Sequence, residues 1–158
     1  MAKIYKPKSK STNLGKQLNL AIESLDINGD GVARYNNKPV FIAGALPGEQ
    51  VKVKVTEEKS KYQRGALLRI ETASHERISA KCEHFGKCGG CQLQHINDKE
   101  QKQFKQDKVD LLFKRNADVQ ALPWQSILAG SEWHYRRKSR IGIQYNKNDE
   151  PIVGFRQG

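Results

Sequence analysis

The sequence predicts a mainly β chain with some α-helix: a small, OB-like, five-stranded β-barrel, then a cysteine-rich loop, one helix and a short β-hairpin. Residues 17–72 alternate apolar and polar positions in short runs separated by Gly, Pro and Asn turns, a pattern typical of small barrels. All three cysteines lie within residues 82–91. A helical pattern from residue 97 and a second alternation from residue 141 follow them.

The first 16 residues predict a disordered basic arm ahead of the barrel. They contain five lysines and no acidic residue, with few side chains to bury. The whole chain carries a formal net charge of +11. This excess favours a polyanionic partner, because each neutralised phosphate releases condensed counterions. The alternative is that the charge only keeps the protein in solution.

The apolar runs of the chain are short. None approaches the roughly 18 residues of a membrane-spanning helix, and no apolar signal segment follows the first methionine. We therefore expect a cytoplasmic protein without a membrane partner. We also expect it to be a monomer.

The expected barrel strands run through residues 17–25, 32–35, 39–42, 51–55 and 62–72. The clearest is VKVKV at 51–55, which directs three valines to one face and two lysines to the other. Turns are predicted at residues 28–31, at Asn36-Asn37 and at Pro47-Gly48, because Gly and Asn tolerate a positive φ. Closure of the strands into a barrel would remove the exposed sheet edges. An open sheet packed on the following region is the alternative.

The stretch 82-CEHFGKCGGC-91 predicts a metal site with Cys82, Cys88 and Cys91 as ligands. A disulfide is disfavoured, because three is an odd number and cytoplasmic thiols stay reduced. Structural zinc would need a fourth ligand such as His84 or His95. An iron-sulfur cluster suits a glycine-rich loop that wraps closely around a bulky inorganic core. The chemistry of the residues favours the cluster over zinc and leaves both open.

A capping box at Asn97 and Glu100 predicts a helix of about 16 residues that ends at Asn116. Its apolar side chains are expected to face a core: Phe104, Leu111, Leu112 and Phe113. A hairpin is expected next, with Ile141, Ile143 and Tyr145 on one strand, residues 146–149 as its turn and residues 153–156 on the partner strand.

Two clusters are candidates for RNA contacts. The first joins the stacking rings Trp133, His134 and Tyr135 to the cations Arg136, Arg137, Lys138 and Arg140. The second is Tyr62 beside Arg64 on the last barrel strand. Unpaired bases stack on aromatic rings while cations hold the phosphates. The alternatives are that the arginines pair with carboxylates elsewhere and that the tyrosines pack in the core.

Several of these features resemble the motifs of one known family. The run SLDINGDGVARYNNKPVFIAGALPGEQVKVKV resembles a TRAM domain, a small RNA-binding barrel. The following CEHFGKCGGCQLQHI resembles the iron-sulfur motif of uracil-C5 RNA methyltransferases, and HYRRKSRIGIQY lies downstream. In this order the chain, from Asn19 to Phe155, resembles the N-terminal portion of the bacterial 23S ribosomal RNA uracil-C5 methyltransferases.

The resemblance implies an N-terminal fragment that binds ribosomal RNA and holds a 4Fe-4S cluster on Cys82, Cys88 and Cys91. The family takes a fourth cysteine ligand from farther along, and this chain has no fourth cysteine. In the family, S-adenosylmethionine binds a catalytic domain that follows, so we expect no catalytic residue in this chain and no activity from the chain alone. The expected division is an arm at 1–16, a TRAM-like barrel at 17–72 and an iron-sulfur and RNA-facing region at 73–158. The alternative function is a free-standing, zinc-stabilised RNA-binding or ribosome-associated module.

Overall fold

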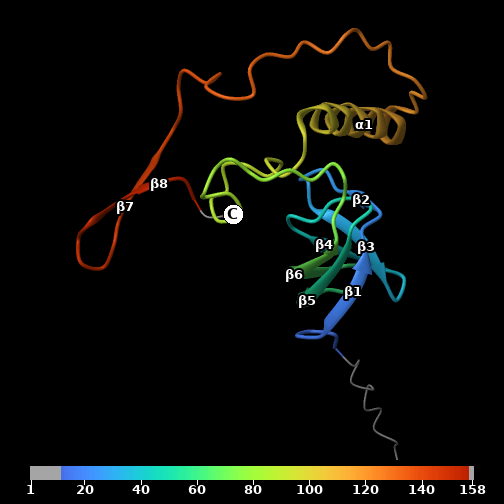
Figure 1. Cartoon of the computed structure of the whole chain (residues 1–158), viewed down its shortest axis with the longest axis horizontal. Helices are drawn as coiled ribbons and strands as arrows, with labels where there is room; N and C mark the ends of the chain where they lie inside the picture. The colour runs from blue at the N-terminus through green and yellow to red at the C-terminus, as the bar shows by residue number, and fades with distance from the viewer. Residues whose placement is uncertain (1–11, 157–158) are drawn as a thin grey trace, which may run out of the picture. The chain divides into compact units, whose positions relative to one another are not determined.

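The computed structural model describes residues 12–156, which form two units. The first unit comprises residues 12–26 and 30–73, and the second comprises Ile27–Gly29 and the residues from Ser74 onward. Figure 1 shows the strands of the first unit in blue and green, and the helix and hairpin of the second in yellow to red. The described residues contain no helix that is both long and apolar enough to cross a membrane.

The first unit is a curled six-stranded sheet. Its strands are β1 (Gln17–Ala21), β2 (Ser24–Leu25), β3 (Gly31–Tyr35), β4 (Lys38–Ile42), β5 (Gln50–Glu58) and β6 (Gln63–Thr72). They lie in the order β1-β5-β6-β4-β3-β2, and all neighbours are antiparallel except β4 and β6, which are parallel. The predicted mainly β fold is confirmed.

The curl of the sheet comes from a change of partner within residues 17–25. Residues 17–21 pair with β5, and the amide of Ile22 still donates to the carbonyl of Glu49 at 2.9 Å. The next amide, of Glu23, donates to the carbonyl of Val32 at 2.8 Å, and β2 then pairs with β3. The segment expected as one strand is therefore two strands, which lie at opposite ends of the strand order. Because they are consecutive in the chain, the sheet curls back on itself at this bend.

One apolar core fills the concave face of this sheet. The valines Val51, Val53 and Val55 of β5 are 1%, 0% and 1% exposed, as their alternation predicts. They pack with Leu18, Leu20, Val40 and Ile42, among others, in one cluster. Full burial of each such aliphatic side chain stabilises the fold by roughly 1.5–3 kcal/mol, so this face fixes the register of β5. Lys52 and Lys54 consequently point outward.

The tight turns lie where the sequence predicts them. Asn36 and Asn37 have φ values of 50° and 62° and join β3 to β4. Two consecutive positive φ angles match the right-handed twist of a two-residue hairpin. Gly48 has a φ of 80° directly after Pro47, as a type II turn requires.

The second unit has little regular structure besides α1 (Asp98–Ala117) and the hairpin of β7 (Gly142–Tyr145) and β8 (Pro151–Gly154). The side chain of Asn97 accepts a 2.9 Å hydrogen bond from the Glu100 amide, which confirms the predicted helix start. The helix is longer than expected, because Asn116 remains helical and the left-handed Asp118 ends it.

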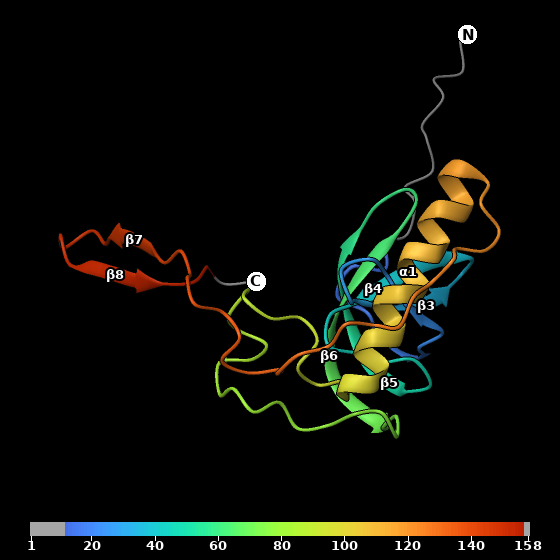
Figure 2. The ribbon, with the colours of Figure 1, turned by 90° about the horizontal axis from the view of Figure 1, so that it is seen from above.

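The expected burial of one face of α1 is not observed. None of its described residues is buried, and Leu112 and Phe113 are each 46% exposed. Both strands of the hairpin are exposed as well. The first lies where the sequence predicts it, whereas β8 begins at Pro151, two residues before the predicted start. After α1 the chain turns back, runs alongside the helix and then enters β7, as Figures 1 and 2 show.

The expected disordered arm at 1–16 lies only partly within the described residues. Residues 1–11 are outside them, but residues 12–16 are attached to β5. The Asn13 amide and side chain donate to the Glu58 carboxylate at 2.6 and 3.2 Å, and the Thr12 hydroxyl does so at 3.1 Å. Gln63 adds a donor at 3.0 Å from β6. The ordered barrel therefore begins earlier than residue 17.

These donors stabilise the ionised form of Glu58. The hydrogen bond from the Asn13 amide, followed by that from Gln63, lowers the pKa of the carboxyl to about 2. A group whose pKa is lower in the folded state contributes stability above its unfolded pKa, about 4.3, and loses it as the pH falls toward the folded value.

We predict that Glu58→Gln lowers the unfolding temperature at pH 7 and that its difference from wild type shrinks as the pH falls from about 5 to about 2. Thermal unfolding followed by circular dichroism at each pH measures this. Glu23→Gln is the matched control, because it removes only an exposed ion pair with Arg34 on the same barrel. A Glu58→Gln difference that stays constant with pH would show that the carboxylate does not anchor residues 12–16.

Candidate nucleic-acid interface and cysteine loop

The barrel brings together Tyr62 and Arg64, one of the two predicted groups of RNA contacts. Tyr62 stands edge-on to Phe41, with ring centroids 5.9 Å apart and an interplanar angle of 73°. The Arg64 guanidinium lies 6.0 Å from the centre of the Tyr62 ring. The half-buried Tyr62 ring therefore has a packing role in the barrel wall, in addition to the face it turns toward Arg64.

Two carboxylates compensate the charge of Arg64. Its guanidinium lies 3.4 Å from Asp30 and 3.5 Å from Glu57. Burial, with help from the charge of Asp26, raises the pKa of Asp30, and the nearby Arg64 opposes that rise. A phosphate at Arg64 would have to compete with both acids, so this arginine is less available than its sequence context indicates.

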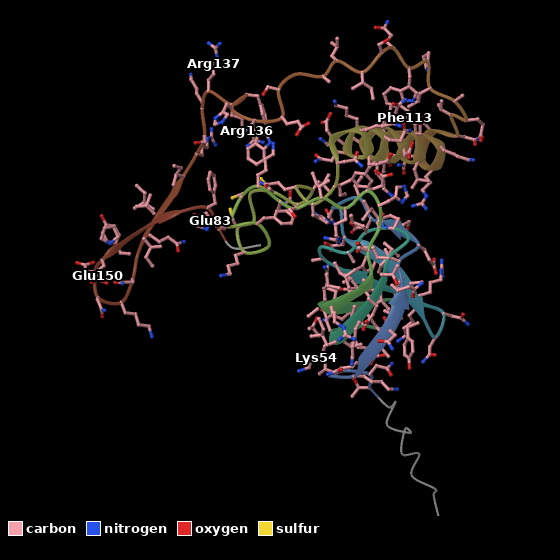
Figure 3. All side chains as sticks on the ribbon, viewed as in Figure 1. Lys54, Glu83, Phe113, Arg136, Arg137 and Glu150 are labelled. Carbon is pink, nitrogen blue, oxygen red and sulfur yellow. The ribbon has the colours of Figure 1, made fainter. Side chains whose placement is uncertain are left out.

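A basic strip that the sequence did not single out lies on the convex face of the sheet. Lys52 of β5 stands directly across from Arg69 of β6, and Lys54 follows on the same face. Arg69 is also bonded to Glu71 at 2.6 Å. Figure 3 labels Lys54 on the outside of the barrel. The alternation of residues 51–55 identified the lysines as outward, but only the cross-strand register places Arg69 beside them.

The other predicted group of RNA contacts lies in residues 133–140, the cationic segment. It has no regular secondary structure and leads into β7, and Figure 3 labels Arg136 and Arg137 on it. Tyr135 is 62% exposed, and the Arg136 guanidinium lies 5.5 Å from the centre of its ring. The other predicted cations are exposed too: Arg137, Lys138 and Arg140. The structure therefore places one cation, Arg136, beside an accessible ring, and the RNA contacts of this segment stay a prediction.

The cysteine loop, residues 82–91, is built from short-range backbone hydrogen bonds. The Phe85 amide donates to the Cys82 carbonyl at 3.1 Å and the Cys88 amide to the His84 carbonyl at 2.9 Å. Gly86 takes a φ of +84°, a conformation that favours glycine. Gln94 closes the loop from outside, because its side-chain oxygen accepts from the Cys82 amide at 3.3 Å.

The donor chemistry of this loop fits a thiolate-bound metal centre. All three thiols are free, and Cys91 is exposed. The Gly90 amide points at the Cys88 sulfur at 3.4 Å, the type of hydrogen bond that stabilises a metal-bound thiolate. A side chain at Gly90 would start 3.3 Å from that sulfur, so glycine keeps its surroundings open. Within residues 12–156, however, no three His, Cys, Asp or Glu side chains are grouped closely enough to hold a metal ion.

His95 is buried, 3% exposed, and does not join the cysteines. Its ring packs against Phe85 with centroids 5.2 Å apart, and its carbonyl accepts from the Ile78 amide at 2.9 Å. The His95 ring therefore supports the cysteine loop by packing against it. His84 is exposed and lies 3.5 Å from Glu83.

Residues 11–68 match the sequence pattern of the TRAM domain, and they contain the curled sheet up to Leu68 of β6. Among the relatives of this chain is the 23S rRNA (uracil(1939)-C(5))-methyltransferase RlmD of Colwellia psychrerythraea. It is 47% identical over 99% of this chain and 35% of its own length. The RlmD proteins of Shewanella piezotolerans and Yersinia enterocolitica are 43% and 42% identical over 99% of this chain, and over 36% and 35% of their own lengths. The resemblance to ribosomal RNA uracil-C5 methyltransferases is therefore confirmed, and the chain spans about a third of the length of these relatives.

A solved structure of a conserved protein of Methanococcus maripaludis is also similar. It is 31% identical, covers 43% of this chain and 100% of its own, and has a TM-score of 0.38.

Proposed function

We propose that this chain is the RNA-binding portion of a 23S ribosomal RNA uracil-C5 methyltransferase. The observation that carries the proposal is the match of 99% of the chain to relatives named for this reaction, together with the TRAM domain. The net charge of +11 and the exposed cationic segment support a phosphate-rich partner. A ribosomal RNA partner implies a protein of the cytoplasm.

The methyl transfer itself belongs to the remaining two-thirds of the relatives' length. S-adenosylmethionine would supply the methyl group there. The residues of this chain would bind and orient the RNA: the convex face of the barrel and the cationic segment would hold phosphates, and Tyr135 would take a base. Arg64 would contribute to the structure of the barrel more than to RNA binding, because Asp30 and Glu57 already pair with it.

The cysteine loop would carry the iron-sulfur cluster in this proposal. Cys82, Cys88 and Cys91 would be its ligands, with a fourth ligand from outside this chain. The glycine beside the Cys88 sulfur and the amide that points at that sulfur support this assignment. The cluster would supply a rigid cross-link for a unit with little regular structure, as structural metals do.

We predict that the chain binds a 23S rRNA fragment containing the target uridine with an affinity that falls steeply with salt. Removing residues 1–11, which contain four lysines, should weaken binding to every RNA equally. It should also flatten the slope of log K against log salt by about 0.7–0.9 for each lost phosphate contact. Fluorescence anisotropy with a labelled fragment over a salt series measures both effects.

Residues 12–16 stay in that variant because they are bonded to Glu58 and β5, so the barrel keeps its edge. A scrambled RNA of equal length is the control for selectivity. Absence of binding to either RNA at low salt would refute the proposed function. An unchanged slope would show that the arm does not contact RNA.

We predict that anaerobic reconstitution with iron and sulfide gives the chain a broad visible absorbance that fades in air. Cys88→Ser should abolish this absorbance, because it removes one of the three thiolates expected to bind the cluster. Absorbance and iron content per chain measure the effect.

His84→Ala is the matched variant, because His84 is exposed and would matter only to a zinc site with three cysteines and one histidine. It should leave the absorbance unchanged. The opposite result is a chain that takes up no iron, binds stoichiometric zinc, and loses that zinc in His84→Ala or His95→Ala. That result would show that the loop is a zinc site and not a cluster site.

A further inference from the structure

We propose that a groove within the second unit is a binding site for single-stranded RNA, with Trp133 and Tyr135 as its base-stacking platform. This inference rests on the proposed function and adds where an unpaired stretch of RNA would lie. The groove has a volume of about 830 Å³ and lies between α1, residues 91–94 at the end of the cysteine loop, and residues 124–136. All of its lining residues belong to the second unit.

The groove exists because the chain turns back after α1 and runs alongside it. At the far end of the groove, the Trp124 indole donates a 2.9 Å hydrogen bond to the Asp110 carboxylate of α1. Nearer the cationic segment, Ser131 and Trp133 form a local turn, with the Ser131 hydroxyl donating to the Trp133 carbonyl at 2.6 Å. The Trp124 bond therefore holds the returning segment to α1, whereas the Ser131 bond is local to the segment.

Both aromatic platforms have a cation over the ring. The Lys81 ammonium lies 5.5 Å from the centre of Trp133, and the Arg136 guanidinium lies 5.5 Å from the centre of Tyr135. Cations near an aromatic ring orient it and remain within reach of a phosphate. A base that stacks on either ring would thus bring its own phosphate next to a positive charge.

Beside apolar residues such as Leu93, Val109 and Ile127, the lining includes cations for phosphates and amides for base edges. Lys102 and Lys105 of α1 line the groove, with only Asp98 and Glu132 as acidic residues among the lining. Asp98 and Lys102 pair with each other, so these two charges offset one another. The amide side chains Gln92, Gln94, Gln101 and Gln106 also line the groove, and amides both donate to and accept from base edges. In Gln92, Gln94 and Gln101, one atom of the amide is already bonded within the chain, which leaves the other atom for a base.

The shape of the site favours single strands over duplex RNA. Side chains read the bases of a duplex poorly, because the major groove of an A-form helix is deep and narrow, whereas unpaired bases are free to stack on aromatic rings. The volume falls within the roughly 300–1,000 Å³ typical of ligand sites, so it fits a short stretch of strand and not a helix.

Binding in the groove can be followed by intrinsic tryptophan fluorescence, because both tryptophans of the chain, Trp124 and Trp133, line it. Titration with a single-stranded oligouridylate of about six nucleotides, within the usual site size, should quench their fluorescence. The same RNA annealed to its complement should quench less. The affinity of the chain for the single strand is measured in the same titration.

Trp133→Ala should weaken binding of the single strand about 5- to 150-fold, which corresponds to the roughly 1–3 kcal/mol of one base stacked on an aromatic ring. Trp133→Phe keeps a ring and should recover most of the affinity. Tyr135→Ala should weaken binding similarly, while Tyr145→Ala is the matched control: an exposed tyrosine on β7 outside the groove. Circular dichroism and thermal unfolding verify that each variant keeps the wild-type fold.

Equal affinity of wild type, Trp133→Ala and Tyr135→Ala for the single strand would overturn the groove proposal. If the chain still binds the 23S rRNA fragment, the proposed function stands without it. Binding to neither the single strand nor the rRNA fragment would refute the proposed function, and the groove proposal with it. Equal quenching by single-stranded DNA and RNA would keep the stacking site but remove its selectivity for RNA.

Discussion

The change of hydrogen-bond partner at Ile22 and Glu23 is the constraint on which the barrel depends. One amide donates to Glu49 beyond the β4–β5 turn and the next to Val32 of β3, so a single bend joins both ends of the sheet. The valines of β5 then face a closed core, and the lysines between them must face the solvent. The geometry that buries the valines therefore places Lys52 and Lys54 on the outer surface of the barrel.

Local features of this fold could be predicted from the sequence because neighbouring residues determine them. The alternation at 51–55, the Asn36-Asn37 turn and the Asn97 cap each act within one strand or one turn. The split of residues 17–25 could not be predicted, because it follows from pairing with two distant strands. The carboxylate partners of Arg64 and the attachment of residues 12–16 to Glu58 depend on distant residues in the same way.

In the proposed function, the two units would contribute differently to RNA binding. On the barrel, Arg64 and Arg69 already have carboxylate partners, so its contribution to binding would come from Lys52, Lys54 and overall charge. In the second unit, rings and cations stand together at Trp133, Tyr135 and the groove beside them. Charge gives affinity without choice, whereas stacking on unpaired bases selects structure, so selectivity would belong to the second unit.

Ultraviolet cross-linking of the chain to a 23S rRNA fragment, with mass spectrometry of the cross-linked peptides, tests this division most directly. We expect cross-links to unpaired nucleotides at Trp133 and Tyr135, and weaker ones without preference for unpaired nucleotides on the barrel. Cross-links to unpaired nucleotides confined to the barrel, with peptides of residues 124–140 unmodified, would contradict the division.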